Sequence, residues 1–304
     1  MEFINALLSQ IIVYTAIYTL VSLGVVIAGR TGIFNISGEG VMLTAAAVGF
    51  MGAFFSGSWL VGFLAGAAIG AIFGLILAFV HETFKVNQFI LGIFLVILGT
   101  GLSDLLYRLI MGVRLTAPKA PPVPAAQIPL IGDIPIIGAV VNQNPIVYFV
   151  YIASALLFWF FYRTKMGLET RAIGESPQAA DVVGVNVRRR RYVMTIIGAA
   201  LMGIAGAYLP LVITGTYNPN MSAGRGFMAI GIAIFASWKP HRALLGGFIF
   251  ALIEVVSYQL QLASQAIPFQ FFLMLPFIGV IVIMMIFKRR IEFPASIGKP
   301  YSRE

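Results

Sequence analysis

Residues 163–191 read RTKMGLETRAIGESPQAADVVGVNVRRRR, and this polar, basic stretch separates two long apolar segments. A short helix is predicted inside it, because Ser176 suits the position that caps a helix N-terminus and Pro177 suits the first helical position. The helix would cover residues 178–183, and Gly184 suits the left-handed position that ends a helix. Its small apolar face would either fit a groove of another protein or belong to an ordinary solvated loop. That face consists of Ala179, Ala180 and Val183.

The composition on both sides of this stretch is that of a membrane protein. Of the 304 residues, 60% are hydrophobic and only 10% are charged, whereas soluble domains are typically about 25% charged. Several apolar runs exceed the roughly 18 residues that mark a membrane-spanning helix. They do not alternate polar and apolar residues, as the strands of an outer-membrane barrel do. The sequence therefore predicts an all-α, polytopic bundle of transmembrane helices.

About nine spans, with a range of eight to ten, are predicted, and one of them is too short to cross about 30 Å of hydrocarbon. Gly-rich polar segments near residues 29–41 and 214–237 would be broken or re-entrant. They either repeat in two halves of the chain, as in many transporters, or match by chance. Residues 1–290 would form one transmembrane domain, with a tail at 291–304. The spans are expected at 4–28, 41–55, 60–80, 89–110, 145–162, 192–213, 227–237 (the short one), 243–262 and 269–287.

The basic residues indicate how the chain lies in the membrane. The net charge is +9, and the positive residues gather in short loops beside spans, which the positive-inside rule explains better than nucleic-acid binding does. The run Arg188–Arg191 is expected at the lipid headgroups. The chain would be a multi-pass protein of the cytoplasmic (inner) membrane. Counting spans puts its N-terminus outside, whereas a re-entrant segment near residues 29–41 would put it inside. The cytoplasmic segments would be 163–191, 239–242 and the tail, and the outer loops 114–144 and 214–226.

Polar residues within the apolar segments are the candidates for a solute pathway. Glu39 could cap the helix that begins near Gly40, or line the pathway. Glu254, Ser257 and Gln261 form a polar stripe along one helix, which either faces the pathway or bonds to a neighbouring helix. The full candidate set is Asn35, Glu39, Asn218, Glu254, Ser257 and Gln261.

The sequence offers little for catalysis. It contains no GxxxxGK[ST], HExxH or GxSxG motif, and without cysteine it has no disulfide, thiolate metal ligand or cysteine nucleophile. We therefore expect no enzyme, no bound metal and no bound cofactor. Asp104 and Arg108 stand four residues apart on one span, so we expect a structural ion pair near the outer interface.

Four stretches together resemble the permease subunit of ATP-binding-cassette (ABC) importers, in the branch that serves branched-chain amino acids, simple sugars and nucleosides. The likeness covers most of residues 1–290 and is strongest to the nucleoside permeases linked to basic membrane lipoproteins. Ala236 departs from the pattern, since relatives commonly have glycine there. The stretches are RTGIFNISGEGVML at 30–43, GLETRAIGESPQAADVVGVNVRRRR at 167–191, the small-residue run 198–206, and GRGFMAIGIAIFASWKP at 224–240.

The resemblance implies a transport subunit that performs no chemistry itself. Its partners would be a cytoplasmic ATPase that uses ATP and Mg, a second permease (homologous, or an identical copy), a solute-binding lipoprotein and membrane lipid. The short helix in the 163–191 loop would couple to the ATPase. The implied contact residues are Arg171, Gly174, Glu175, Ser176, Pro177, Ala179, Ala180 and Gly184.

A nucleoside is the solute that this resemblance favours. A sugar of the ribose or galactose type is the alternative within the same class. A different class, the ion-driven secondary transporter, would use Glu39 and Glu254 as ion-coupling carboxylates and would need no ATPase.

Overall fold

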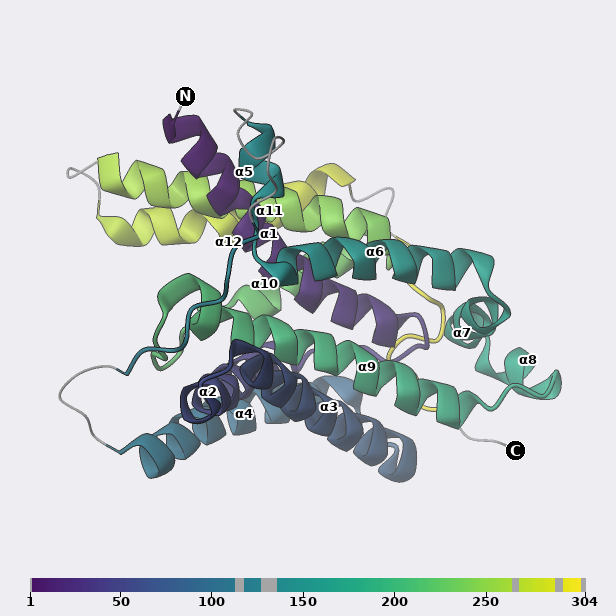
Figure 1. Cartoon of the computed structure of the whole chain (residues 1–304). Helices are drawn as coiled ribbons and strands as arrows, with labels where there is room; N and C mark the ends of the chain where they lie inside the picture. The colour runs from purple at the N-terminus through teal and green to yellow at the C-terminus, as the bar shows by residue number, and fades with distance from the viewer. Residues whose placement is uncertain (1, 113–117, 127–135, 264–267, 288–291, 302–304) are drawn as a thin grey trace.

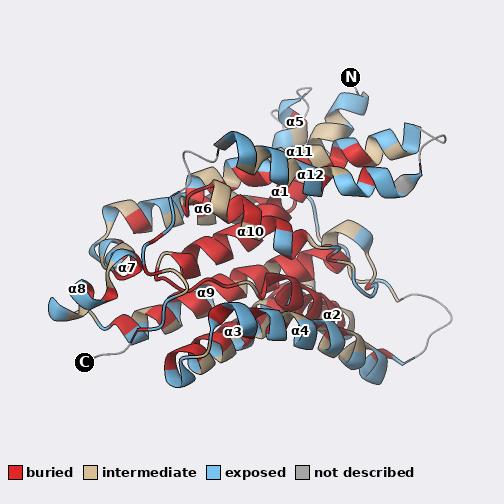
Figure 2. Cartoon of the chain, turned by 180° about the vertical axis from the view of Figure 1, so that it is seen from behind, coloured by how far each residue is buried: buried red, intermediate tan, exposed pale blue. Residues whose placement is uncertain are grey.

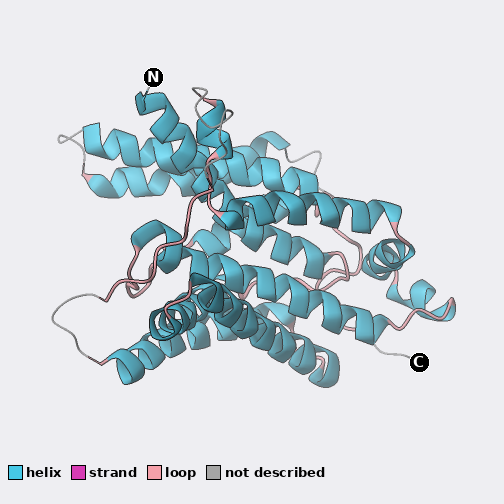
Figure 3. Ribbon diagram, viewed as in Figure 1, coloured by secondary structure: helices cyan, strands magenta, loops and turns pink. Residues whose placement is uncertain are grey.

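The computed structural model describes residues 2–112, 118–126, 136–263, 268–287 and 292–301, and within these ranges it contains helices and loops but no strand (Figure 3). The all-α prediction is therefore confirmed. The helices are α1 (Glu2–Gly29), α2 (Gly38–Ser56), α3 (Trp59–Phe84), α4 (Gln88–Met111), α5 (Ile137–Val141), α6 (Pro145–Arg163), α7 (Lys165–Glu175), α8 (Pro177–Val182), α9 (Val187–Tyr208), the π-helix η1 (Leu209–Thr214), α10 (Arg225–Phe235), α11 (Pro240–Ala263) and α12 (Phe269–Phe287).

Seven helices in the described part are long and apolar enough to cross a membrane: α1, α2, α3, α4, α6, α9 continued by η1, and α11. The chain is thus a multi-pass membrane protein. α10 and the described part of α12 are apolar but shorter, so the count of about nine spans stays a prediction. α10 has 11 residues, as expected of a helix that crosses only part of the membrane.

The two ends of α1 mark the two faces of the molecule (Figure 1). At its start, Asn5 Oδ1 accepts a hydrogen bond from the Ile136 amide at 2.9 Å. At its end, the Arg30 carbonyl lies against Gly174 of α7. The N-terminus therefore shares one face with the loop before α6, and α7 and α8 lie on the opposite face, as the charge pattern predicts.

The two halves of the chain pack in corresponding ways. α1 packs on α11 and α10, and in the same manner α9 packs on α3 and α2; α2 contacts α4 as α10 contacts α12. α1 ends at the face that holds α7 and α8, whereas α9 begins there, so the second half runs in the opposite direction. The structure thus favours an inverted repeat, in which the breaks before α2 and before α10 correspond.

α1 and α9 form the buried centre of the bundle (Figure 2). α9 approaches α3 closely because α3 carries glycine at every fourth position along this contact. A Cβ at Gly70 would lie 2.2 Å from the Ala199 carbonyl oxygen, and one at Gly66 would lie 2.8 Å from that of Gly203. Such close approach supplies the van der Waals packing that holds membrane helices together.

We expect Gly70→Ala to destabilise the protein by about 1–3 kcal/mol, the usual cost of overpacking, because neither helix backbone can move away locally. Gly101→Ala on α4 is the matched control, since nothing lies within 4 Å of a Cβ there and alanine is the better helix former. Thermal unfolding of the purified protein in detergent measures both. Equal shifts for the two variants would contradict the close α3–α9 contact.

Candidate functional site

The two helix breaks meet inside the bundle. α2 begins beside the middle of α4, where a Cβ at Gly40 would lie 2.5 Å from the Leu95 carbonyl oxygen and one at Gly99 would lie 2.4 Å from that of Gly40. The start of α10 abuts this point, since a Cβ at Gly226 would lie 2.4 Å from the Glu39 amide nitrogen. The N-termini of α2 and α10 therefore touch near mid-bundle, where helix N-termini are well placed to hold a negative group.

Glu39 supplies that negative group. Its carboxylate accepts hydrogen bonds from the Gly224 and Gly226 amides, each at 2.8 Å, and from the Ser222 hydroxyl at 2.5 Å. The side chain is almost fully buried. Of the two roles left open for Glu39, a helix cap or a pathway residue, the structure shows a cap. Glu39 lies in the first turn of α2, but the amides that it binds are those at the start of α10.

Arg30 holds the opposite end of α10. Its Nε donates to the Trp238 carbonyl at 2.7 Å and its Nη2 to the Ser237 carbonyl at 3.3 Å, just beyond the last turn. A cation is favoured at this negative end of the helix dipole. Burial lowers the pKa of Arg30, yet an arginine keeps its proton in proteins. The segment 30–39 thus holds α10 at both ends with charges of the appropriate sign.

A second buried charge cluster joins α10 to α11. Glu254 Oε1 accepts from Arg225 Nη2 at 2.6 Å and from its Nε at 3.0 Å. The other oxygen accepts from the Tyr18 hydroxyl at 2.6 Å, and the Tyr258 hydroxyl lies 3.0 Å from Oε1. Arg225 was not among the sequence candidates, although it is a lone charge inside a break that the sequence did identify. Glu254 thus forms a bond between helices, one of the two roles open to it, and it also borders the pocket described next.

A pocket of about 150 Å³ lies beside this cluster, between α10, α11 and α12. Glu254, Ser257 and Gln261 all line it, so the predicted stripe does face a common cavity. The Ser257 hydroxyl donates to the Ile253 carbonyl of its own helix at 2.6 Å. Phe272 and Phe277 of α12 supply aromatic walls. The pocket could accept a small, largely apolar ring with a few polar edges.

The other pathway candidates lie elsewhere. Asn35 is buried, and its Oδ1 accepts from the Ser37 amide at 3.0 Å and hydroxyl at 2.6 Å, which shapes the turn into α2. Asn218 is exposed in the loop before α10. Asp104 and Arg108 form the predicted ion pair, at 2.9 Å.

The predicted short helix exists as α8. The Ser176 hydroxyl accepts from the Ala179 amide at 3.3 Å, Pro177 occupies the first turn, and Gly184 has φ +86° beyond the end. Ala179 is exposed, and so are Val182 (88%) and Val183 (77%).

Some of the residues expected to contact an ATPase are buried inside the chain, and others are exposed. Pro177 and Ala180 are buried, and Ala180 packs on Ile173 and Val187. Gly174 is buried too, since a Cβ there would lie 2.5 Å from the Arg30 carbonyl oxygen. The Arg171 guanidinium lies over the Tyr162 ring at 4.9 Å, and Glu175 is exposed. The apolar face expected for a partner is therefore Ala179, Val182 and Val183, without Ala180.

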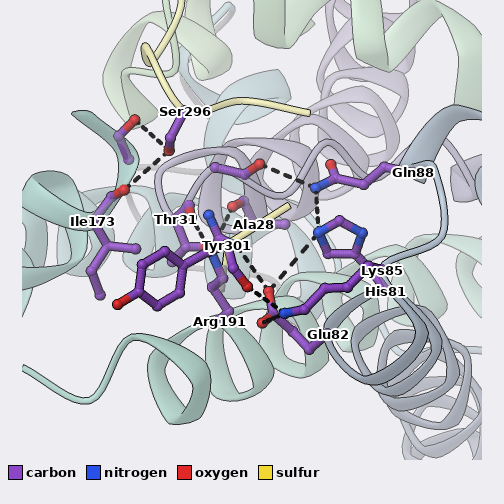
Figure 4. A network of polar contacts seen from close by, with 12 residues as sticks. Ala28, Thr31, His81, Glu82, Lys85, Gln88, Ile173, Arg191, Ser296 and Tyr301 are labelled. Carbon is purple, nitrogen blue, oxygen red and sulfur yellow. Dashed lines mark hydrogen bonds and ion pairs between the residues drawn. The ribbon is translucent and has the colours of Figure 1, made fainter. Parts of the chain in front are cut away.

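The expectation that the run Arg188–Arg191 lies at lipid headgroups was wrong for Arg191. That side chain is fully buried; it pairs with Glu82 at 2.9 Å and donates to the Thr31 carbonyl at 3.0 Å (Figure 4). Arg190 pairs with Glu169 at 2.5 Å. Among the described residues, no cluster of His, Cys, Asp and Glu could hold a metal ion.

Comparison with known proteins agrees with this architecture over nearly the whole chain. The family model described as "Branched-chain amino acid transport system / permease component" matches residues 7–286. TsgC13 of Haloferax volcanii, whose name assigns it provisionally to glucose ABC transport as a permease, is 34% identical over 88% of this chain and 80% of its own. The guanosine ABC transporter permease protein NupQ of Bacillus subtilis is 31% identical over 99% of this chain and 97% of its own.

A further relative and one solved structure complete the comparison. The nucleoside ABC transporter permease protein NupC of Lactococcus lactis is 28% identical over 98% of this chain and 97% of its own. An inward-facing ABC transporter, provisionally of the metal-chelate type, matches with a TM-score of 0.50 and 20% identity, over 90% of this chain and 85% of that one. This last likeness shows a shared fold.

Proposed function

The chain belongs to the family of permease components of branched-chain amino acid transport systems, and on that premise we propose that it forms the membrane pathway of an ABC importer for a nucleoside. The evidence for a nucleoside as the solute is the 31% identity with a guanosine permease over 99% of this chain. A sugar is the second candidate, because TsgC13 is 34% identical. As a transport subunit, the chain would leave ATP hydrolysis to its ATPase partner.

The pocket between α10, α11 and α12 supports a neutral solute. Arg225 and Glu254 cancel each other's charge beside it, so a charged solute would meet no free counter-charge and would lose its hydration without compensation. The aromatic rings and the Gln261 amide suit a nucleobase, which presents a flat face and hydrogen-bonding edges. We assign the solute path to this side of α11.

The buried carboxylates argue against ion-driven transport. Glu39 and Glu254 each accept hydrogen bonds from groups of the protein itself. A carboxylate so engaged is a poor reversible site for a proton or sodium ion, because binding the ion would mean giving up those bonds. An ATPase at the face of α8 supplies the energy instead.

The direct test is uptake into vesicles that contain the chain together with its ATPase, second permease and binding lipoprotein. We expect ATP-dependent uptake of labelled guanosine that survives collapse of ion gradients with ionophores. Labelled glucose and ribose distinguish the sugar alternative. Uptake by the chain alone that ionophores abolish would overturn the proposal.

Val182→Glu is expected to release the ATPase. If Val182 enters an apolar groove of that subunit, the buried unpaired charge costs more than about 1.4 kcal/mol, which is tenfold in affinity. The amount of ATPase that co-purifies with the permease measures this. Ala172→Glu, at an exposed position of α7, is the matched control with the same charge change. Retention of the ATPase by both variants would contradict docking at α8.

A further inference from the structure

Residues 292–301 near the C-terminus lie along α7. The Ser296 amide donates to the Gly174 carbonyl at 2.9 Å, and the Ser296 hydroxyl lies 2.7 Å from the same oxygen and 3.0 Å from that of Ile173. The last carbonyls of a helix lack partners within the helix. Ser296, itself almost fully buried, therefore supplies donors to the C-terminal end of α7, although it lies 122 residues beyond Gly174 in the sequence.

The same segment is tied to α8. The Tyr301 hydroxyl bonds to Asp181 Oδ2 at 2.9 Å, and its ring packs with Ala180 and Val187. The Tyr301 carbonyl accepts from Lys85 Nζ at the end of α3, and Lys85 lies 3.8 Å from Glu82. The tail thus joins α8 to the end of α3. Figure 4 shows the part of this connection that Tyr301, Lys85 and Glu82 form.

A third set of contacts reaches the segment 30–39, which holds α10. The Gly298 amide donates to the Gly32 carbonyl at 3.1 Å. Gly32 has φ +85°, and a Cβ there would lie 2.4 Å from the Ser296 hydroxyl, so only glycine fits against the tail. The Phe293 ring lies 4.7 Å from that of Trp238, whose carbonyl is bound by Arg30.

We propose that residues 292–301 form a link that carries movement of α8 to the segment 30–39 and so to α10, in addition to the direct contact of Gly174 with the Arg30 carbonyl. This rests on the proposed docking of an ATPase at α8. A helix of six residues is marginal by itself, and coupling between distant sites travels through chains of packed and hydrogen-bonded groups. Ser296 and Tyr301 are positioning residues in this link. Tyr301 binds Asp181 of α8, and Ser296 binds the end of α7 and lies against Gly32 of the segment 30–39.

The test uses the complete transporter in vesicles and compares transport per ATP hydrolysed. In the double variant Ser296→Ala, Tyr301→Phe, we expect this ratio to fall about fivefold or more, the low end of typical couplings between sites. The ATPase should co-purify in the wild-type amount and still hydrolyse ATP. Lys299→Ala, at an exposed position within the same tail, should leave the ratio unchanged.

The outcomes separate this inference from the proposed function. A wild-type complex without ATPase, or without ATP-driven uptake, refutes the proposed function itself. A wild-type complex that works, with an unchanged ratio in the double variant, overturns only the link. A loss of thermal stability and assembly in proportion to transport would show a merely structural tail and would also overturn it. If the double variant does not fold, the single variant Tyr301→Phe, which keeps the ring, is used instead. A fall in its transport per ATP hydrolysed supports the link, and an unchanged value overturns it.

Discussion

Arg225→Met is expected to abolish uptake and to destabilise the protein by about 3–5 kcal/mol, the cost of leaving one charge of a buried ion pair without its partner. Arg225 and Glu254 have side chains that are only 7% and 6% exposed, and their closest atoms lie 2.6 Å apart. Once the guanidinium is lost, the carboxylate keeps only tyrosine hydroxyls as partners. The start of α10 would then lose its bond to α11.

Removing both charges distinguishes a buried pair from two unrelated contacts. The double variant Arg225→Met, Glu254→Gln leaves no uncompensated charge, so it should be more stable than Arg225→Met alone. Thermal unfolding of the four proteins of this cycle gives the interaction energy. Arg108→Met is the matched control, since Arg108 is 72% exposed in its pair with Asp104 and such pairs contribute about 1 kcal/mol or less. Strictly additive losses in the cycle would refute the coupling.

Features that depend on neighbouring residues could be predicted from the sequence. The apolar run at 89–110 became α4 (Gln88–Met111), within one residue at either end. Ser176, Pro177 and Gly184 marked the start and end of α8 because capping depends on residues within one turn. The Asp104–Arg108 pair followed from helical spacing alone.

Contacts between distant segments could not be predicted in this way. Arg225 binds Glu254, Arg191 binds Glu82, and Ser296 binds Gly174, and in each pair the partner lies far along the chain. No local pattern specifies which distant group a buried charge will meet. Arg191 shows the consequence: in sequence it is one of four arginines suited to lipid headgroups, and only the packing of α9 on α3 and the 30–33 turn buries it.

The inverted arrangement of the two halves explains why the polar segment 30–40 both leads into α2 of the first half and binds α10 of the second half. From the sequence, Glu39 was expected either to cap the helix that begins near Gly40 or to line the pathway, and no role was predicted for Arg30. In the fold, the corresponding break of the other half lies against this segment, so Arg30 and Glu39 hold the two ends of α10. Their Gly-rich polar composition located both breaks in the sequence, but only the fold shows that the segment 30–39 binds both ends of α10.

Glu39 provides the second large expected effect. Glu39→Gln keeps the size of the side chain but replaces one acceptor oxygen with an NH₂ group. The amides of Gly224 and Gly226 bind different oxygens of Glu39, so one of the two amides loses its acceptor. Hydrogen bonds to a charged group contribute about 1.5–3 kcal/mol each, so we expect a clear loss of stability and a frayed N-terminus of α10. Hydrogen exchange should then rise in the first turns of α10 but not in α11, and uptake should fall.

Glu175→Gln is the control, since it makes the same change at an exposed position and should leave exchange in α10 as it is. Glu39→Asp keeps the charge but shortens the side chain by one methylene. If the distance to the amides matters, hydrogen exchange in α10 should lie between that of Glu39→Gln and that of the wild type. Unchanged exchange in α10 for Glu39→Gln, together with lost uptake, would mean that Glu39 acts on the solute and not on the helix. Raised exchange with lost uptake would instead show that the pathway requires α10 to be held at its N-terminal end.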